Sequence, residues 1–264
     1  MKNTQTQFGF KTASPEERDR EVQQVFSSVA SRYDVMNDVM SGGLHRLWKD
    51  RMVSQIHRAK NLRVLDVAGG TGDIAFRIYE KLFVLRSSFF DANNEQPTTN
   101  NAQITVCDRN PEMLAEGRAR AINRGIQGVT WQEGDAQALP FADNQFDYYT
   151  IAFGLRNVTR LQDGLLEAFR VLKPGGRFLC LEFSPEVGPE IIRRFYDLYS
   201  FKVIPYVGEK ITGDREAYQY LIESIRVFPA PDALVGLMAQ AGFSRCRYEK
   251  MSFGVVCLHS GYKI

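Results

Sequence analysis

A glycine-rich turn directly after a short apolar stretch is the feature with the clearest chemical meaning. The stretch 64–67 is apolar except for Asp66, and the turn that follows it contains Gly69, Gly70, Thr71 and Gly72. Glycines let the backbone approach a ligand closely, and a helix beginning near Asp73 presents free N–H groups at the same place. The turn therefore predicts a site for a nucleotide or nucleoside cofactor, with a tight turn that binds nothing as the alternative.

The spacing of the glycines restricts the cofactor. A dinucleotide-binding turn needs a third glycine, but Ile74 and Ala75 occupy its position, and no phosphate-binding lysine follows. An acid before a compact turn, here Asp66, instead suits a sulfonium amino acid, because a carboxylate attracts its ammonium group.

Two further acids follow the next two expected strands. Asp108 ends the second strand, where a carboxylate can accept both hydroxyls of a ribose. A helix cap is the alternative role for Asp108, although Asn110 is better placed for capping. Asp135 follows the third strand, and its carboxylate could accept a hydrogen bond from the exocyclic amine of adenine.

Alternating strands and helices position these residues. Between residues 61 and 183 the expected strands are 63–67, 104–107, 129–131, 148–152 and 177–182, separated by helices that begin near Asp73, Pro111 and Leu161. This alternation predicts an α/β fold with a parallel sheet and helices on both faces.

The two ends of the chain and one internal segment differ from this pattern. Residues 1–60 read as helical, with one helix starting at Ser14-Pro15. Residues 184–264 carry aromatic-rich helices and then a strand pair at 245–250 and 255–261. The polar, turn-rich segment 85–101 reads as a surface insertion.

The composition excludes several classes of protein. Lys and Arg number 33 against 31 Asp and Glu, which is too balanced to indicate nucleic acid or an anionic membrane as an electrostatic partner. The four cysteines and three histidines show no metal-ligand spacing, so we expect no metal. No apolar run approaches the roughly 18 residues that span a bilayer. Residues 1–11 lack both a signal-peptide core and the arginines of a transit peptide, so we expect any targeting segment to lie outside this chain.

The glycine turn, the two acids and the turn 172–178 before the fifth strand together resemble the seven-stranded S-adenosylmethionine-dependent methyltransferases. From residue 8 to 264, except for 85–101, the chain resembles the ubiquinone/menaquinone biosynthesis C-methyltransferases, and most of all their eukaryotic members of coenzyme Q synthesis. The stretches that carry this resemblance are Phe8–Thr12, Val25–Asp34, Met36–Asp38, Met40–Asp50, Ile151–Val158, Leu181–Ser184, Tyr196–Phe201 and Tyr218–Ile225.

The resemblance implies a fold and an activity. The implied fold is the Rossmann-like class I S-adenosylmethionine-dependent methyltransferase fold, whose seven-stranded sheet has an antiparallel last strand. Residues 1–60 would form an N-terminal helical cap, 61–264 the methyltransferase domain, and 189–227 a helical lid over the substrate. The implied reaction moves the methyl group of S-adenosylmethionine to a ring carbon of a polyprenylated methoxy-benzoquinol.

The resemblance also implies contacts and a location. In the family the cofactor lies against the positions of Thr71, Asp108, Asp135 and Ala136, whereas a serine of the bacterial members is replaced here by Ala152. Other coenzyme Q biosynthesis proteins in a complex, a second copy in a homodimer and a peripheral contact with the membrane surface are the implied partners. The implied location is the matrix side of the mitochondrial inner membrane; a bacterial homologue would be cytoplasmic.

Candidates for catalysis follow from the reaction. A hydroquinone carbon is strongly nucleophilic only when its hydroxyl loses its proton, so the site must hold a phenolate and exclude water. Arg156 and Asn157 follow the fourth strand, where the substrate lies in this fold class, and we expect Arg156 to stabilise the phenolate. The alternative is an arginine that pairs structurally with an acid. His45 is a candidate general base, or else an ordinary helix residue.

Four tyrosines are candidates for the substrate pocket. Tyr33 and Tyr218 could line it or belong to the core, and Tyr196 and Tyr199 belong to the expected lid. Three other functions compete with this one: a methyltransferase for another small molecule, a nicotinamide dehydrogenase, and a non-catalytic scaffold for quinone synthesis. The glycine spacing disfavours the dehydrogenase.

Overall fold

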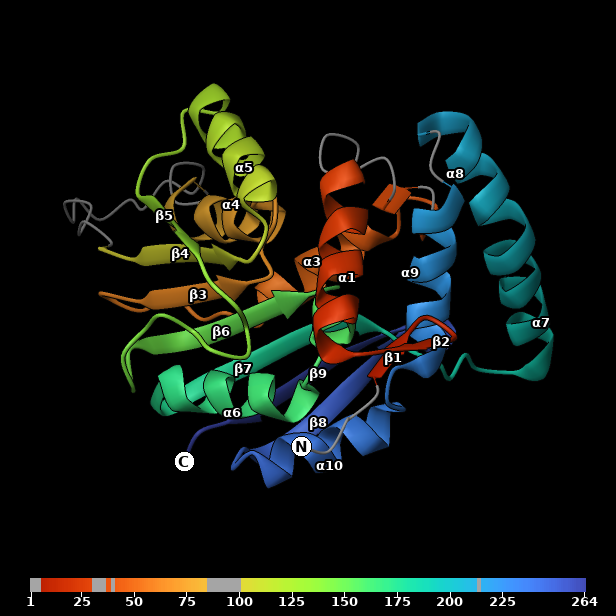
Figure 1. Ribbon diagram of the computed structural model, residues 1–264. Helices are drawn as coiled ribbons and strands as arrows, with labels where there is room; N and C mark the ends of the chain where they lie inside the picture. Colours follow the sequence, from red (N-terminus) through yellow and green to blue (C-terminus); the bar gives the residue numbers. More distant parts are fainter. Residues whose placement is uncertain (1–5, 30–36, 39–40, 85–100, 213–214) are drawn as a thin grey trace, which may run out of the picture.

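The computed structural model describes residues 6–29, 37–38, 41–84, 101–212 and 215–264. Its centre is a seven-stranded sheet with the order β5-β4-β3-β6-β7-β9-β8 (Figure 1). The strands are β3 (Arg63–Val67), β4 (Gln103–Asp108), β5 (Val129–Glu133), β6 (Phe146–Ala152), β7 (Leu172–Phe183), β8 (Ser244–Met251) and β9 (Val256–Tyr262). Strand β9 is antiparallel to both of its neighbours, while the remaining pairs are parallel. The predicted sheet with an antiparallel last strand is thus confirmed.

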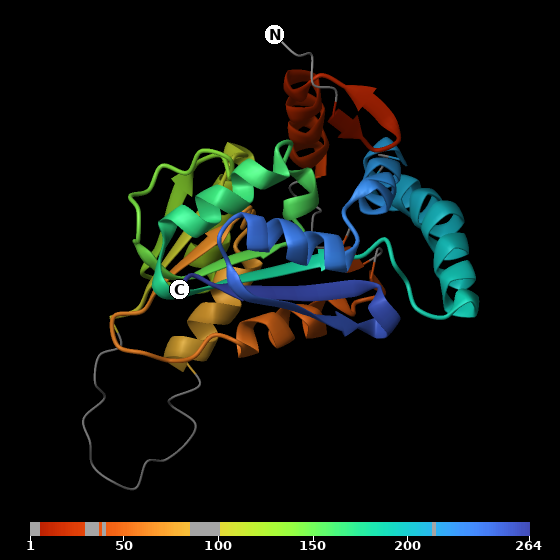
Figure 2. The ribbon, with the colours of Figure 1, turned by 90° about the horizontal axis from the view of Figure 1, so that it is seen from below.

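Helices cover both faces of the sheet, as the alternating pattern predicts (Figure 2). On one face, α3 (His45–Ser54) and α4 (Asp73–Tyr79) pack with the π-helical turn η2 (Glu80–Val84) and α5 (Pro111–Asn123). On the other face lie α6 (Leu161–Val171) and α10 (Pro231–Gln240). Each face buries its own apolar cluster, because central strands such as β3 and β7 are flanked on both sides and are buried along most of their length.

The sheet has a topological switch point between β3 and β6. The chain runs outward from β3 through β4 to β5, then returns to form β6 on the other side of β3. Loops after adjacent strands therefore diverge at this point and leave a crevice at the carboxyl ends of the strands. The glycine turn follows β3 and lies at this crevice.

A second group of elements stands beyond these carboxyl ends (Figure 1). It comprises a hairpin of β1 (Thr6–Phe8) and β2 (Lys11–Ala13), then α1 (Pro15–Val29), α7 (Glu190–Leu198), η4 (Tyr199–Val203), α8 (Ile204–Thr212) and α9 (Arg215–Val227). The hairpin and α9 are joined where the Phe10 N–H donates to Glu223 Oε2 over 3.1 Å. The N-terminal segment and the 189–227 helices thus form one unit, although they are far apart in sequence.

The structure confirms the predicted start of α1, whereas the sequence does not predict the hairpin that precedes it. Ser14 and Glu17 form a capping box, in which each side chain accepts from the other's backbone N–H at 3.2 and 2.9 Å. These hydrogen bonds lower the pKa of Glu17. The hairpin strands have only three residues each, too few to show an alternating pattern, so the expectation of helices alone in residues 1–60 is wrong there. The predicted insertion 85–101 lies, except for Asn101, outside the described residues.

Candidate active site

A cleft opens at the carboxyl ends of β3, β4 and β6. Helix α1 and the buried side of α3 contribute walls to it. The predicted residues that line it are Asp66, Gly69, Gly70, Thr71, Asp108, Asp135, Ala136 and Asn157.

The glycine turn needs glycine for two separate reasons. Gly72 has a φ of 84°, which disfavours any residue with a side chain. A Cβ at Gly69 would lie 2.7 Å from Asp66 Oδ2 and 2.7 Å from Val106 Cγ1, so no side chain fits there. The turn thereby keeps its backbone at the surface of the cleft, where N–H groups at the start of α4 can face a ligand.

Asp108 is held in a fixed orientation at the end of β4. Its Oδ2 accepts from the Gly70 N–H at 2.8 Å, and its Oδ1 accepts from the Asn110 N–H at 2.8 Å. Asn110 caps α5, accepting from the Met113 N–H at 2.9 Å, which leaves Asp108 free of that role. Burial raises the pKa of Asp108, and the backbone donors oppose this rise. Each carboxylate oxygen can still accept a second hydrogen bond, so the group suits a diol.

Asp66 is the buried acid beneath the turn. Thr150 Oγ1 donates to its Oδ1 at 2.8 Å, whereas its Oδ2 has no hydrogen-bond partner among the described residues. Burial raises the pKa of Asp66 to about 7, and the neighbouring Asp108 adds to the shift. An unpartnered buried carboxylate oxygen in a cleft is costly unless a ligand supplies a donor, and an ammonium group would satisfy it.

Asp135 and α1 close the far side of the cleft. Asp135 Oδ1 accepts from the Gln137 N–H at 2.8 Å, which fixes its carboxylate beside Ala136. Arg109 Nη1 lies 2.9 Å from Asp19 Oδ2 on α1 and 3.7 Å from Asp135 Oδ2. Asp19 lines the cleft but carries no local sequence signal, because its place depends on how α1 packs against the sheet.

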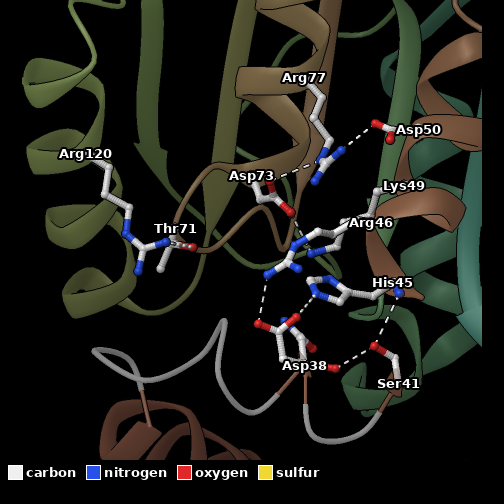
Figure 3. A network of polar contacts seen from close by, with 11 residues as sticks. Asp38, Ser41, His45, Arg46, Lys49, Asp50, Thr71, Asp73, Arg77 and Arg120 are labelled. Carbon is white, nitrogen blue, oxygen red and sulfur yellow. Dashed lines mark hydrogen bonds and ion pairs between the residues drawn. The ribbon is translucent and has the colours of Figure 1, made fainter. Parts of the chain in front are cut away.

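A buried lysine lies on the opposite wall. Lys49 of α3 lines the cleft with a side chain that is only 4% exposed, and its Nζ lies 2.7 Å from Asp73 Oδ2 (Figure 3). Asp73 is also paired with Arg77 at 3.1 Å. Burial would raise the pKa of Asp73, but Lys49 and Arg77 outweigh it and the pKa is lowered. The cleft thus holds a paired, buried ammonium group that the sequence analysis did not single out.

Comparison with known proteins agrees with this geometry. A model of the ubiE/COQ5 methyltransferase family matches residues 12–263. The mitochondrial 2-methoxy-6-polyprenyl-1,4-benzoquinol methylase of Arabidopsis thaliana is 51% identical, over 98% of this chain and 90% of the relative. The protein of the same name from Homo sapiens is 48% identical, over 98% and 85%.

The chain belongs to the ubiE/COQ5 methyltransferase family. Among solved structures, a possible histamine N-methyltransferase from Thermotoga maritima matches with a TM-score of 0.60 and 18% identity, over 92% of this chain and all of that one. An S-adenosylmethionine-dependent methyltransferase from Aquifex aeolicus matches with a TM-score of 0.56 and 15% identity, over 83% and 93%. These likenesses confirm the predicted fold class. The chain is therefore an S-adenosylmethionine-dependent methyltransferase.

Arg156 of this methyltransferase is buried beside the cleft and does not belong to its described lining. Its Nη1 lies 2.7 Å from Glu182 Oε1 and donates to the Phe153 carbonyl at 2.6 Å. Glu182 Oε2 also accepts from the Arg156 N–H at 3.2 Å. These contacts favour the alternative left open by the sequence, an arginine that pairs with an acid. The next residue, Asn157, does line the cleft and accepts from the Tyr220 hydroxyl at 3.0 Å.

His45 also lies outside the described lining of the cleft. Its Nε2 lies 2.9 Å from Asp38 Oδ1, and Arg46 contacts the other oxygen of Asp38 at 2.8 Å (Figure 3). Burial and the nearby Lys49 lower the pKa of His45, while Asp38 opposes the shift. The structure thus places His45 in a network that adjoins Lys49, one turn away on the same helix.

The predicted substrate tyrosines are spread over several environments. Tyr218 is fully buried in the apolar cluster that joins α9 to the sheet. The Cζ of Arg226 lies 5.5 Å from the ring centroid of Tyr196, so the guanidinium stacks over this ring. Tyr199 is half-buried against the apolar cluster that contains Tyr218. These three tyrosines are absent from the described lining of the cleft, and Tyr33 lies outside the described residues.

Within the described residues, no helix has both the length and the apolar character needed to cross a bilayer. The same part of the chain contains no group of three or more His, Cys, Asp or Glu side chains that could hold a metal ion.

Proposed function

We propose that this methyltransferase moves the methyl group of S-adenosylmethionine to a ring carbon of 2-methoxy-6-polyprenyl-1,4-benzoquinol in ubiquinone biosynthesis. The observation that carries the proposal is near full-length identity of 51% and 48% to two proteins that bear this substrate in their names. The cleft supports it, because acids at three positions match the three polar parts of the cofactor.

Each acid suits one part of S-adenosylmethionine. The unpartnered Oδ2 of Asp66 would accept from the ammonium group, and the glycine turn Gly69–Gly72 would hold the amino acid part with Thr71 at its edge. Asp108 would accept from both ribose hydroxyls. Asp135 and Ala136 would contact the adenine. When bound there, the cofactor supplies an electrophilic methyl group on a positively charged sulfur.

The remaining polar groups of the cleft would act on the substrate. In the reaction a ring carbon gains the methyl as the bond from methyl to sulfur breaks, and that carbon then gives its own proton to water while the quinol oxygen regains one. Removal of the hydroxyl proton to water makes the ring carbon nucleophilic, and the ammonium group of Lys49 can stabilise the resulting phenolate. Asn157, held by Tyr220, can orient the ring. Arg156 would then act by fixing the loop 153–158 through Glu182, and His45 by supporting α3.

The helices of residues 189–227 are proposed to form the lid and to receive the polyprenyl tail. Ile191, Leu198 and Tyr206 are each more than half exposed on α7 and α8. Such an apolar surface suits the tail or a bilayer surface. Because of these exposed apolar side chains, we propose a peripheral contact with the matrix side of the mitochondrial inner membrane. We also propose that the chain forms a complex with other coenzyme Q biosynthesis proteins or with a second copy of itself.

Titration calorimetry with S-adenosylhomocysteine, followed by an assay with a short-tailed methoxy-benzoquinol, tests the function. We expect one binding site and a methylated quinol whose new methyl is on carbon. Binding without any methylation of this quinol, under conditions that keep it reduced, would reject the proposed substrate. Absence of binding by the folded chain would favour the scaffold instead.

A further inference from the structure

A second pocket lies on the sheet, away from the cleft and sharing no lining residue with it. It has a volume of about 280 Å³ between the end of α3 and the three strands β7, β9 and β8. This is far above the roughly 15 Å³ that a single water needs. Three arginines line it, Arg51, Arg177 and Arg247, against one carboxylate, Glu249.

Arg177 is the residue that makes this pocket unusual. It is only 5% exposed, yet it forms no ion pair within the described residues. Its Nη1 and Nη2 donate to the backbone carbonyl and side-chain oxygen of Gln55 at 3.2 and 3.0 Å, and its Cζ lies 5.2 Å from the Tyr262 ring centroid. Its Nε has no hydrogen-bond partner in that part of the chain. A buried guanidinium keeps its charge, so neutral partners leave it uncompensated.

The other charged side chains of the pocket do not compensate the positive charge of Arg177. Glu249 forms a two-pronged ion pair with Arg51, at 3.0 Å from Nε and 2.8 Å from Nη2. Arg247 is exposed at the rim on β8, and no described carboxylate lies within ion-pair distance of it. The carboxylate of the pocket is therefore engaged, and two guanidinium groups are left for an anion.

We propose that this pocket binds a phosphate group, as inorganic phosphate or as part of a phosphate ester. The planar guanidinium fork matches phosphate oxygens, and both Arg177 and Arg247, which form no ion pair within the described residues, line the pocket. An anion here would compensate the charge of Arg177 and stabilise the folded chain. This inference concerns a site outside the methyl-transfer cleft and does not depend on the proposed function.

Binding can be measured with the purified full chain in phosphate-free buffer of constant ionic strength, by calorimetry with inorganic phosphate and with glycerol 3-phosphate. Sedimentation with phosphatidylcholine vesicles, with and without phosphatidic acid, separates a lipid headgroup from a free phosphate. We expect one site, weakened about tenfold in Arg247→Gln, which is the loss of one charge-assisted contact. Arg245→Gln removes an exposed charge two residues away on β8, outside the pocket, and should bind like the parent chain.

Arg177→Met tests the buried charge itself. We expect its melting temperature without phosphate to match or exceed that of the parent, because an uncompensated buried cation is removed, and its phosphate-dependent rise to disappear. The proposal is overturned if the parent binds neither free phosphates nor phosphatidic acid vesicles. It is equally overturned if Arg245→Gln weakens binding as much as Arg247→Gln does.

Discussion

The ammonium group of Lys49 lies 2.7 Å from the carboxylate of Asp73, and both residues line the proposed cofactor cleft. The pair connects α3, which precedes the sheet in sequence, with the first turn of α4 behind the glycine turn. Lys49 is thereby held in the wall of the proposed methyl-transfer cleft while its charge is balanced. Arg156, the expected cationic residue, instead has its charge balanced by Glu182.

Replacement of Lys49 by Met should reduce turnover much more than cofactor binding. Without the ammonium group the phenolate loses its electrostatic stabilisation, and we expect a decrease in kcat of about 100-fold. Affinity for S-adenosylhomocysteine should change only a few-fold, since Asp73 keeps its contact with Arg77. Lys173→Met, which removes an ion pair with Asp147 far from the cleft, serves as the control and should retain full activity. Equal losses of binding and turnover in Lys49→Met would assign Lys49 a structural role.

Cofactor affinity should increase with pH around neutrality because of Asp66. Its pKa is raised to about 7, so it is largely protonated below that pH and can attract an ammonium group only above it. We expect calorimetry to show tighter binding of S-adenosylhomocysteine at about pH 8 than at about pH 6, with proton release on binding. Asp66→Asn should bind weakly at both pH values. A parent chain whose affinity is the same at the two values would contradict the assignment of the ammonium group to Asp66.

The same carboxyl group affects stability in the opposite direction. Because the pKa of Asp66 is higher in the folded than in the unfolded chain, the folded state binds more protons and loses stability as pH rises from about 4 to about 7. The loss from this group amounts to roughly 4 kcal/mol at most. Thermal denaturation of Asp66→Asn and of the parent should therefore diverge as the pH increases, with the variant melting higher at neutral pH. Parallel curves would show that Asp66 is already charged in the folded chain.

Asp108→Ala should lose most of its affinity for S-adenosylhomocysteine. The carboxylate is oriented by the N–H groups of Gly70 and Asn110 and offers its remaining lone pairs to two hydroxyls. Because two charge-assisted hydrogen bonds are lost, we expect the affinity measured by calorimetry to fall about 100-fold or more. Asp143→Ala, at an exposed ion pair with Arg170, is the matched control. Unchanged binding by Asp108→Ala would show that the ribose of the cofactor does not bind to Asp108.

The sequence predicts the parts of this site that are local in the chain. The glycine turn and the three acids, Asp66 within β3, Asp108 at the end of β4 and Asp135 after β5, need only a strand, a turn and a helix to reach the cleft, so their spacing suffices. Lys49 and Asp19 carry no such signal, because each reaches the cleft only when α3 or α1 packs against the sheet. Glu182, in contrast, does carry a signal in the sequence. An acid within an apolar strand requires a buried partner, and Arg156 is that partner.

The pair of Arg156 and Glu182 therefore separates a positioning role from a catalytic one. Both side chains are at most 3% exposed, and removal of either one leaves an uncompensated buried charge. We expect Arg156→Met and Glu182→Met each to destabilise the fold by about 3–5 kcal/mol, and the double variant to recover much of that loss. Chemical denaturation measures the stability, and the benzoquinol assay measures turnover in the same preparations. If Arg156 only positions the loop, turnover of the double variant should recover together with stability. Recovery of stability without any recovery of turnover would instead support the catalytic role of Arg156 that the sequence indicated.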